Sequence, residues 1–206
     1  MKRTKPNAIA RADSEREPDL RSSRRKGIKK APASPIQRRR NSRLPEFVAP
    51  QLATIEDRLP HGDDWLHEIK FDGYRILCRI SGGDVCLITR NRQDWTERWS
   101  FLAKAANELP VDHALLDGEI VALNENGTTN FQLLQNSLST HANDNLAYYV
   151  FDLLHLDGND LMQLPLLTRK ETLAEILKTK SPSSTIRYSE HWLGQGDRLY
   201  GEACRS

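Results

Sequence analysis

Hydrophobic and polar side chains alternate along residues 65–72, directly before a glycine. A period of two residues is typical of a strand with one face toward the core, so we predict a strand over 65–72. One face would carry Trp65, His67, Ile69 and Phe71, and the other Glu68, Lys70 and Asp72. Two further strands are predicted over 74–80 and 85–90. The tight Ser-Gly-Gly-Asp turn between them joins these two strands into a hairpin.

Apolar residues recur at helical spacing over 96–108 and 168–178, and a shorter helix is predicted over 131–138. Thr168, with Glu171 three residues later, matches a capping box at the start of the second helix. The remaining predicted elements are strands over 115–123, 147–154 and 185–189 and a last helix over 197–204. Hairpins mixed with helices favour an α+β fold over a doubly wound parallel sheet.

Charge is divided unevenly along the 206 residues. Residues 1–45 carry fifteen Lys and Arg against four Asp and Glu, a net charge of +11, whereas residues 46–206 carry −9. The first segment has few large apolar residues, so it cannot bury enough surface to offset chain entropy. We predict a disordered basic tail over 1–45 and a folded part over 46–206. Such tails bind phosphate backbones by releasing counterions, although a solvated linker has the same composition.

The composition excludes several classes of protein. No apolar run approaches the ~20 residues of a membrane span, and the charged N-terminus lacks the apolar segment of a secretory signal. Cys78, Cys86 and Cys204 are odd in number and lack metal-site spacing, which argues against a disulfide framework. The six histidines form no pair with ligand spacing. We expect a protein of a reducing compartment with no membrane partner.

The densest group of candidate catalytic side chains surrounds Lys70. Glu68, Lys70 and Asp72 share the polar face of the predicted strand, and Arg75 follows the glycine. A lysine amine becomes nucleophilic when burial or a neighbouring cation lowers its pKa. Arg75 would supply the cation and packing between sheets the burial. The two carboxylates would oppose the lower pKa unless a metal or ligand occupies them. Most lysines on strand faces are only solvated, so the residues alone leave both interpretations open.

The segment from Lys70 to Arg75 has the pattern K-x-D-G-x-R. It resembles the nucleotidyl-transfer motif of ATP-dependent DNA ligases, a superfamily shared with RNA ligases and mRNA-capping guanylyltransferases. Segments 87–95, 116–120 and 149–158 are similar, in the same order, to the motifs that follow it in the family. The surrounding sequence is most similar to the ligase domain of bacterial ligase D, an end-joining enzyme. The resemblance covers residues 45–206 and not the basic tail.

The resemblance implies a role for each matching residue. Lys70 would attack the α-phosphorus of ATP and carry AMP as a phosphoramidate. Glu68 would lie against the adenine edge, and Phe151 would stack on the adenine ring. The remaining contacts would come from Arg75 and Glu119 at the ribose and Arg90 at a phosphate. Outside the motif context, the aromatic residue would be assigned to the core and the charged ones to a solvated face.

The resemblance also implies a fold and an activity. The fold would be an incomplete ATP-grasp-like nucleotidyltransferase (adenylation) domain, with antiparallel sheets flanked by helices. The activity would be ATP-dependent joining of DNA strands through a lysyl-AMP intermediate, in DNA repair and recombination by end joining. The cofactors would be ATP and Mg²⁺ or Mn²⁺, with metal ligands that the sequence does not identify. The partners would be nicked or broken duplex DNA and the Ku end-binding protein, at the nucleoid in the bacterial cytoplasm.

Ligases continue past the last matching segment with an E-G-x-x-x-K type motif, a further lysine motif and an OB-fold domain, and none of these occurs before Ser206. We therefore expect residues 46–206 to be the N-terminal part of an adenylation domain, unable to seal nicks by itself. Faces left uncovered at Val150, Leu153 and Leu154 are expected to be exposed. The alternatives are a non-catalytic remnant, or half of a split enzyme completed by a second chain, that only binds ATP or DNA. A guanylyltransferase or RNA ligase is a weaker alternative, because the similarity to ligase D extends beyond the first motif.

Overall fold

The computed structural model describes residues 42–55, 60, 62–140, 145–178, 185–194, 196 and 201. The chain divides into two units, Met1–Gln37 and Arg38–Ser206, and all described residues belong to the second. The predicted disordered tail therefore lies outside the described residues except at 42–45, and the predicted last helix lies outside them except at Gly201. None of the helices in the described ranges is long and apolar enough to cross a membrane.

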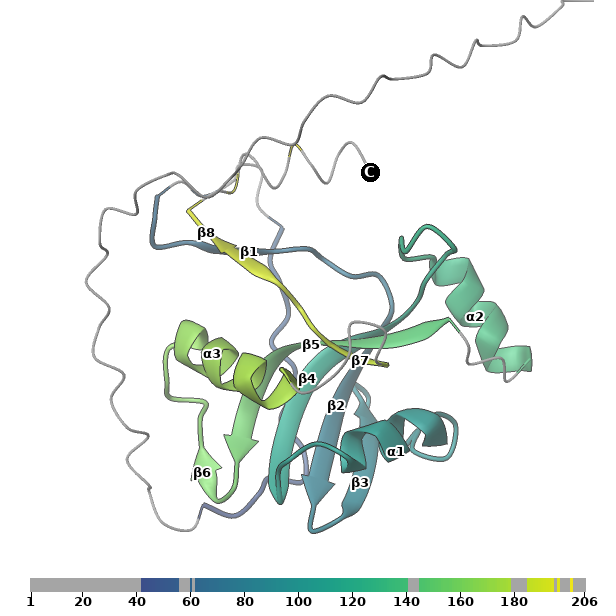
Figure 1. Ribbon diagram of the computed structural model, residues 1–206, viewed down its shortest axis with the longest axis horizontal. Coiled ribbons are helices and arrows are strands. Elements are labelled where there is room, and N and C mark those ends of the chain that lie inside the picture. The colour runs from purple at the N-terminus through teal and green to yellow at the C-terminus, as the bar shows by residue number, and fades with distance from the viewer. Residues whose placement is uncertain are drawn as a thin grey trace, which may run out of the picture. The chain divides into compact units, whose positions relative to one another are not determined.

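Six strands form the larger of two sheets (Figure 1). They are β2 (Tyr74–Ser81), β3 (Asp84–Thr89), β4 (His113–Ala122), β5 (Leu146–Leu156), β6 (Asn159–Asp160) and β7 (Ile186–Tyr188). The order is β3-β2-β4-β5-β6 with antiparallel neighbours, and β7 pairs with β5 in parallel. The predicted α+β class with mainly antiparallel sheets is confirmed. The short strand β6 was not predicted from the sequence.

The predicted hairpin is also confirmed. Ser81 pairs with Asp84 across a two-residue loop, in which Gly82 and Gly83 have φ of +59° and +93°. Positive φ at both loop positions matches the twist of the flanking strands, and glycine adopts it without steric cost.

The strand predicted over 65–72 is mostly wrong. Only β1 (Leu66–Glu68) forms, paired with β8 (His191–Leu193) in a separate small sheet (Figure 1). Because β8 is three residues long, the ladder ends at Glu68. The predicted core face is also wrong, since Trp65 is 51% exposed and Ile69 38% exposed.

Three helices accompany the larger sheet: α1 (Ser100–Asn107), α2 (Phe131–Thr140) and α3 (Leu166–Leu177). The helix predicted from residue 96 starts only at Ser100, because Thr96 is held in the preceding turn, where its hydroxyl accepts from Leu87 N. The capping box is wrong as well. α3 begins after Pro165, two residues before Thr168, and has no side-chain cap at its N-terminus.

The core lies on both faces of the larger sheet. All three helices pack on one face, around buried residues such as Ile76, Leu116, Val150 and Leu173. On the other face, Leu44 packs with Leu77, Leu115 and Leu154. The expectation of exposed Val150, Leu153 and Leu154 is therefore wrong: they are 0%, 0% and 8% exposed, because helices cover the first two and the segment around Leu44 covers the third. Cys78 is also buried.

Candidate functional site

Lys70 lies in the segment 69–73 that connects the small sheet to β2. Its side chain is 82% exposed, and its ammonium group forms an ion pair with the exposed carboxylate of Asp72. Burial of the amine between sheets, which the sequence suggested, is therefore wrong for this arrangement. Instead, the side chain of Lys70 is open to solvent.

The backbone around Lys70 is nevertheless held in place. The ring of Phe71 stacks on Tyr149 of β5, with centroids 4.3 Å apart and planes 18° apart. Gly73 N donates to Glu119 Oε1 over 3.1 Å. A Cβ on Gly73 would lie 2.0 Å from Ile120 O, so only glycine permits this approach to β4. The segment therefore presents an exposed amine from a fixed backbone.

Arg75 and Glu119 face each other across β2 and β4, as paired residues of the sheet register. The guanidinium of Arg75 forms a two-pronged ion pair with Asp117, with Nε–Oδ1 at 2.6 Å and Nη2–Oδ2 at 2.8 Å. Asp117 is only 4% exposed. Such a fork fixes the plane of the guanidinium, which leaves Nη1 without a hydrogen bond to any residue in the described ranges.

Burial dominates the ionisation of both acids on β4. It raises the pKa of Glu119 to about 7, although Arg75, the Gly73 amide and Lys70 all act to lower it. Burial also raises the pKa of Asp117, against the opposing effect of its ion pair with Arg75. Lys70 therefore lies close enough to β4 to affect the pKa of Glu119.

Phe151 owes its orientation to a bulge in β5. Asp152 pairs with Asp117 and Val150 with Gly118, so Phe151 is the extra residue between the two pairs. A bulge commonly changes the direction of a side chain. Here the guanidinium of Arg75 stacks on the ring of Phe151, with Arg75 Cζ 4.4 Å from the ring centroid. The structure therefore brings together three of the predicted site residues, Arg75, Glu119 and Phe151.

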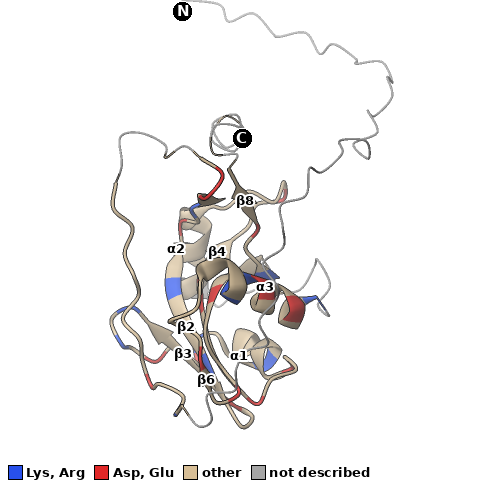
Figure 2. Ribbon diagram, turned by 90° about the vertical axis from the view of Figure 1, so that its left-hand side faces the viewer, with Lys and Arg blue, Asp and Glu red and all other residues tan. Residues whose placement is uncertain are grey.

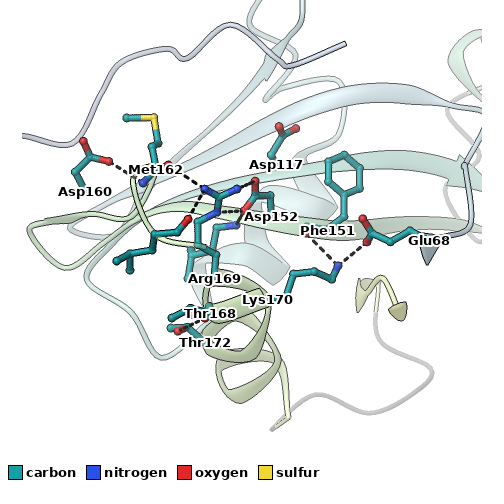
Figure 3. Close-up of polar contacts among 12 residues, drawn as sticks. Glu68, Asp117, Phe151, Asp152, Asp160, Met162, Thr168, Arg169, Lys170 and Thr172 are labelled. Atoms are coloured by element: carbon teal, nitrogen blue, oxygen red, sulfur yellow. Dashed lines mark hydrogen bonds and ion pairs between the residues drawn. The ribbon is translucent and has the colours of Figure 1, made fainter. Parts of the chain in front are cut away.

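Glu68 joins this group through a residue that the sequence did not identify. Lys170 of α3 is completely buried, and its Nζ donates to Glu68 Oε1 at 2.5 Å (Figure 3). The same ammonium donates to Phe151 O at 3.2 Å and to Ser189 O at 3.1 Å. Ser189 Oγ also donates to Glu68 Oε1, at 3.2 Å. Glu68 and the backbone of Phe151 are thus held by one buried cation.

The neighbouring residue secures the helix that carries Lys170. Arg169 forms a two-pronged ion pair with Asp152, at 2.8 and 2.9 Å, and donates to the carbonyls of Met162 and Leu164 (Figure 3). These contacts attach the start of α3 to β5. Figure 2 shows acidic and basic positions side by side on α3. Lys170, one of the basic residues of this helix, is completely buried.

Arg90 is the predicted site residue that the structure does not bring to the others. It is exposed and follows Thr89, which pairs with Ile76 beside Arg75. It therefore lies at the same end of the sheet, without a polar contact to the other predicted site residues among those described.

Lys170 and Ser189 were missed for different reasons. Lys170 lies on the buried stripe of α3 with Leu173 and Leu177, at spacings of three and seven residues. A lysine at a core position of an amphipathic helix was the available signal. Nothing in the local sequence marks Ser189, which reaches Glu68 from 121 residues away.

The side chains of the described residues suit a nucleoside better than a metal ion held by the protein alone. No group of three or more His, Cys, Asp and Glu side chains in that part of the chain is placed to hold a metal ion. The residues do fit a nucleoside, because a partly buried aromatic ring, an arginine and two carboxylates lie near one another at one end of the sheet.

Known proteins match this chain in sequence and in fold. The family profile described as the ATP dependent DNA ligase domain matches residues 46–192. Over 162 residues the chain is 38% identical to the multifunctional non-homologous end joining protein LigD of Pseudomonas aeruginosa, covering 79% of this chain and 19% of that protein. The chain thus spans about a fifth of the length of this relative.

Two solved structures are similar. The ligase domain of LigD from M. tuberculosis aligns with a TM-score of 0.60 and 28% identity, over 70% of this chain and 45% of that one. A mycobacterial DNA ligase D complexed with ATP and MES aligns with a TM-score of 0.54 and 26% identity, over 68% and 44% of the two chains. The observed fold is therefore that of ligase nucleotidyltransferase domains, as predicted.

Proposed function

The chain belongs to the ATP-dependent DNA ligase family, and from this premise we propose that it takes AMP from ATP onto Lys70. The observation that carries the proposal is the exposed amine of Lys70 on a backbone fixed by Phe71 and Gly73. A fixed backbone positions the nucleophile, and positioning accounts for much of the catalysis of phosphoryl-type transfer.

The nucleoside would bind at the end of the sheet where the predicted residues converge. Phe151 offers a ring for the adenine, and Glu68 an acceptor for its edge. Arg75 Nη1 and Glu119 are proposed to contact the ribose hydroxyls, which donate to a carboxylate and accept from a guanidinium. Arg90 is proposed to contact a phosphate when the loop after β3 meets the nucleotide.

In the proposed reaction, the neutral amine of Lys70 attacks the α-phosphorus of ATP. A P–N bond forms, the bond between the α-phosphorus and the bridging oxygen breaks, and pyrophosphate leaves with the electron pair. The attacking nitrogen must have given its proton to solvent and must have left its ion pair with Asp72. Displacement of Asp72 from Lys70 is therefore part of the proposal. A divalent ion such as Mg²⁺ would be held mainly by the phosphates, with few protein ligands, and would offset their charge.

For the whole reaction, we propose that AMP passes to a 5′-phosphate of nicked or broken DNA, and that a 3′-hydroxyl then displaces AMP. Repair by end joining at the bacterial nucleoid, with Ku as a partner, and completion by a second chain are proposals that rest on the resemblance alone. In the alternative, the protein is a non-catalytic remnant that binds ATP or DNA without forming a covalent bond.

DNA contact is proposed for the basic tail. Its charge of +11 contrasts with −9 over the rest of the chain, so binding should be independent of sequence and should weaken steeply with salt. Removal of residues 1–37 takes away +7 of the +11, leaves the packed segment around Leu44 in place and is expected to reduce duplex binding strongly. Undiminished binding after the removal would contradict this role.

The test of the proposed function is transfer of label from ATP carrying ³²P at the α-position, with Mg²⁺ or Mn²⁺. We expect label bound to the chain, stable to denaturation, absent from Lys70→Ala and retained in Lys178→Ala, which removes another exposed lysine. Label that persists in Lys70→Ala would refute the nucleophile. Binding of ATP without covalent label would instead support the non-catalytic alternative.

A further inference from the structure

Every proton of the Lys170 ammonium group has a hydrogen-bond acceptor. Its ammonium group has three protons, and the structure provides three acceptors: Glu68 Oε1, Phe151 O and Ser189 O. The side chain is fully buried, and its Nζ also lies 4.9 Å from the centroid of Tyr188. Because a lysine ammonium can only donate, each atom that faces it must be an acceptor.

The two carboxylate oxygens of Glu68 differ in their hydrogen bonds. Oε1 receives both the ammonium of Lys170 and the hydroxyl of Ser189. Oε2 makes no hydrogen bond to the residues that the structure describes, and the Glu68 side chain is 26% exposed. One oxygen is therefore committed to the protein, and the other is available to a ligand.

We propose that Lys170 is a positioning residue that sets the purine specificity of the site by fixing Glu68 with its free oxygen toward the base edge. The inference rests on the proposed function, in which Glu68 meets adenine. The 6-amino group of adenine donates to a carboxylate oxygen, whereas the 6-oxo group of hypoxanthine or guanine is an acceptor and is repelled. The carbonyl of Phe151 is held by the same ammonium, so the residue that stacks on the base and the one that reads its edge are linked.

Because Lys170 fixes the orientation of the Glu68 carboxylate, it also fixes the orientation of the amide in Glu68→Gln. The amide oxygen must take the place of Oε1, because Lys170 cannot accept a hydrogen bond from an amide nitrogen. The NH₂ group is then directed to the base, where it matches a 6-oxo purine and opposes a 6-amino purine. Without Lys170 the amide can rotate, since the Ser189 hydroxyl can donate or accept. The effect of Glu68→Gln on specificity therefore depends on Lys170.

The experiment compares binding of ATP and inosine triphosphate, which differ in the donor and acceptor pattern at N1 and position 6 of the ring. Equilibrium dialysis of the full chain without divalent metal measures binding with no transfer step. We expect the wild-type chain to prefer ATP. In Glu68→Gln the ratio of ATP to inosine triphosphate affinity falls by about tenfold or more and reverses, so that inosine triphosphate binds more tightly, because one charge-assisted hydrogen bond is lost and the amide matches the 6-oxo group. In Glu68→Gln combined with Lys170→Met, the two nucleotides bind equally.

Lys178→Met is the matched control, because it makes the same substitution at an exposed position directly after the same helix. It should leave the ratio of the two affinities unchanged. Glu68→Gln alone keeps the acceptor for Lys170, so it tests the proposal even if Lys170→Met does not fold. An unchanged ratio in Glu68→Gln, or the same ratio in the single and double variants, would overturn the role of Lys170.

The two proposals fail in different ways. If the wild-type chain binds both nucleotides equally but still transfers AMP to Lys70, the inference about Lys170 is wrong and the proposed function stands. If the wild-type chain binds neither nucleotide, both are wrong.

Discussion

Lys70 and Lys170 end in the same ammonium group, yet 82% of the Lys70 side chain is exposed and none of the Lys170 side chain is. Lys70 has one exposed carboxylate as its partner, on a segment without regular structure. Lys170 has three acceptors from three separate segments of the chain and projects from a helix. The comparison shows how the surroundings of a lysine separate a group that can react from one that can only hold its neighbours.

The two lysines are also supported differently. Lys70 is positioned through its backbone neighbours, because Phe71 stacks on β5 and Gly73 contacts β4. Lys170 is positioned through its own side chain. A substitution at Lys70 should therefore abolish transfer of AMP with little loss of stability. A substitution at Lys170 should mainly lower the free energy of unfolding.

The largest effect on stability is expected from Lys170→Met. The substitution leaves Glu68 without its cation and the carbonyls of Phe151 and Ser189 without this donor, and breaking a buried ion pair costs about 3 kcal/mol. Thermal unfolding should show a clear decrease in Tm, whereas Lys178→Met should change it little, since exposed pairs contribute about 0–1 kcal/mol. Equal effects of the two substitutions would remove the contrast between buried and exposed lysines.

A smaller loss is expected from Gly73→Ala. The added Cβ would lie 2.0 Å from Ile120 O and must push the Lys70 segment away from β4, at a cost of about 2 kcal/mol. Transfer of AMP to Lys70 should decrease with it, because the nucleophile is displaced. Gly127→Ala controls for lost stability alone: its φ of +82° strains an alanine, but nothing lies within 4 Å of its Cβ position, so transfer of AMP should be retained. Full transfer activity in Gly73→Ala would show that the fixed backbone is not needed.

The smallest effect on stability is expected from the titration of Glu119. Burial raises the pKa of its carboxyl from 4.5 to about 7 on folding, so the folded chain binds the proton more tightly than the unfolded one. The contribution to stability is fully present below pH 4.5 and is lost as the pH rises through 7. Between pH 5 and 8, wild type should lose about 1 kcal/mol relative to Glu119→Gln, after allowance for partial exposure. A constant difference in unfolding free energy across this range would contradict the assignment.

Local patterns predicted most of the larger sheet. The strands β2, β3, β4 and β5 follow from alternation and apolar runs, and the hairpin from its two glycines. The pattern failed for 65–72, where alternation resembled a half-buried strand but the partner β8 ends the ladder after three residues. Pairing between segments so far apart is not encoded in either segment alone.

The site was predictable as a set of residues but not as an arrangement. Motif resemblance supplied Arg75, Glu119 and Phe151, which the structure brings together. The bulge that aims Phe151 and the fork between Arg75 and Asp117 depend on the register of three strands. Lys170 was missed because a single lysine in an amphipathic helix is far more often at the surface.

The most direct test of the contrast between Lys70 and Lys170 is the rate at which each amine is acetylated in the folded chain, measured by peptide mass spectrometry. We expect Lys70 and the exposed control Lys178 to react quickly, and Lys170 to react only after unfolding. Addition of ATP without divalent metal should slow acetylation of Lys70 and leave Lys178 unchanged. Reaction of Lys170 at the rate of Lys178, or a Lys70 rate that does not respond to ATP, would contradict the account.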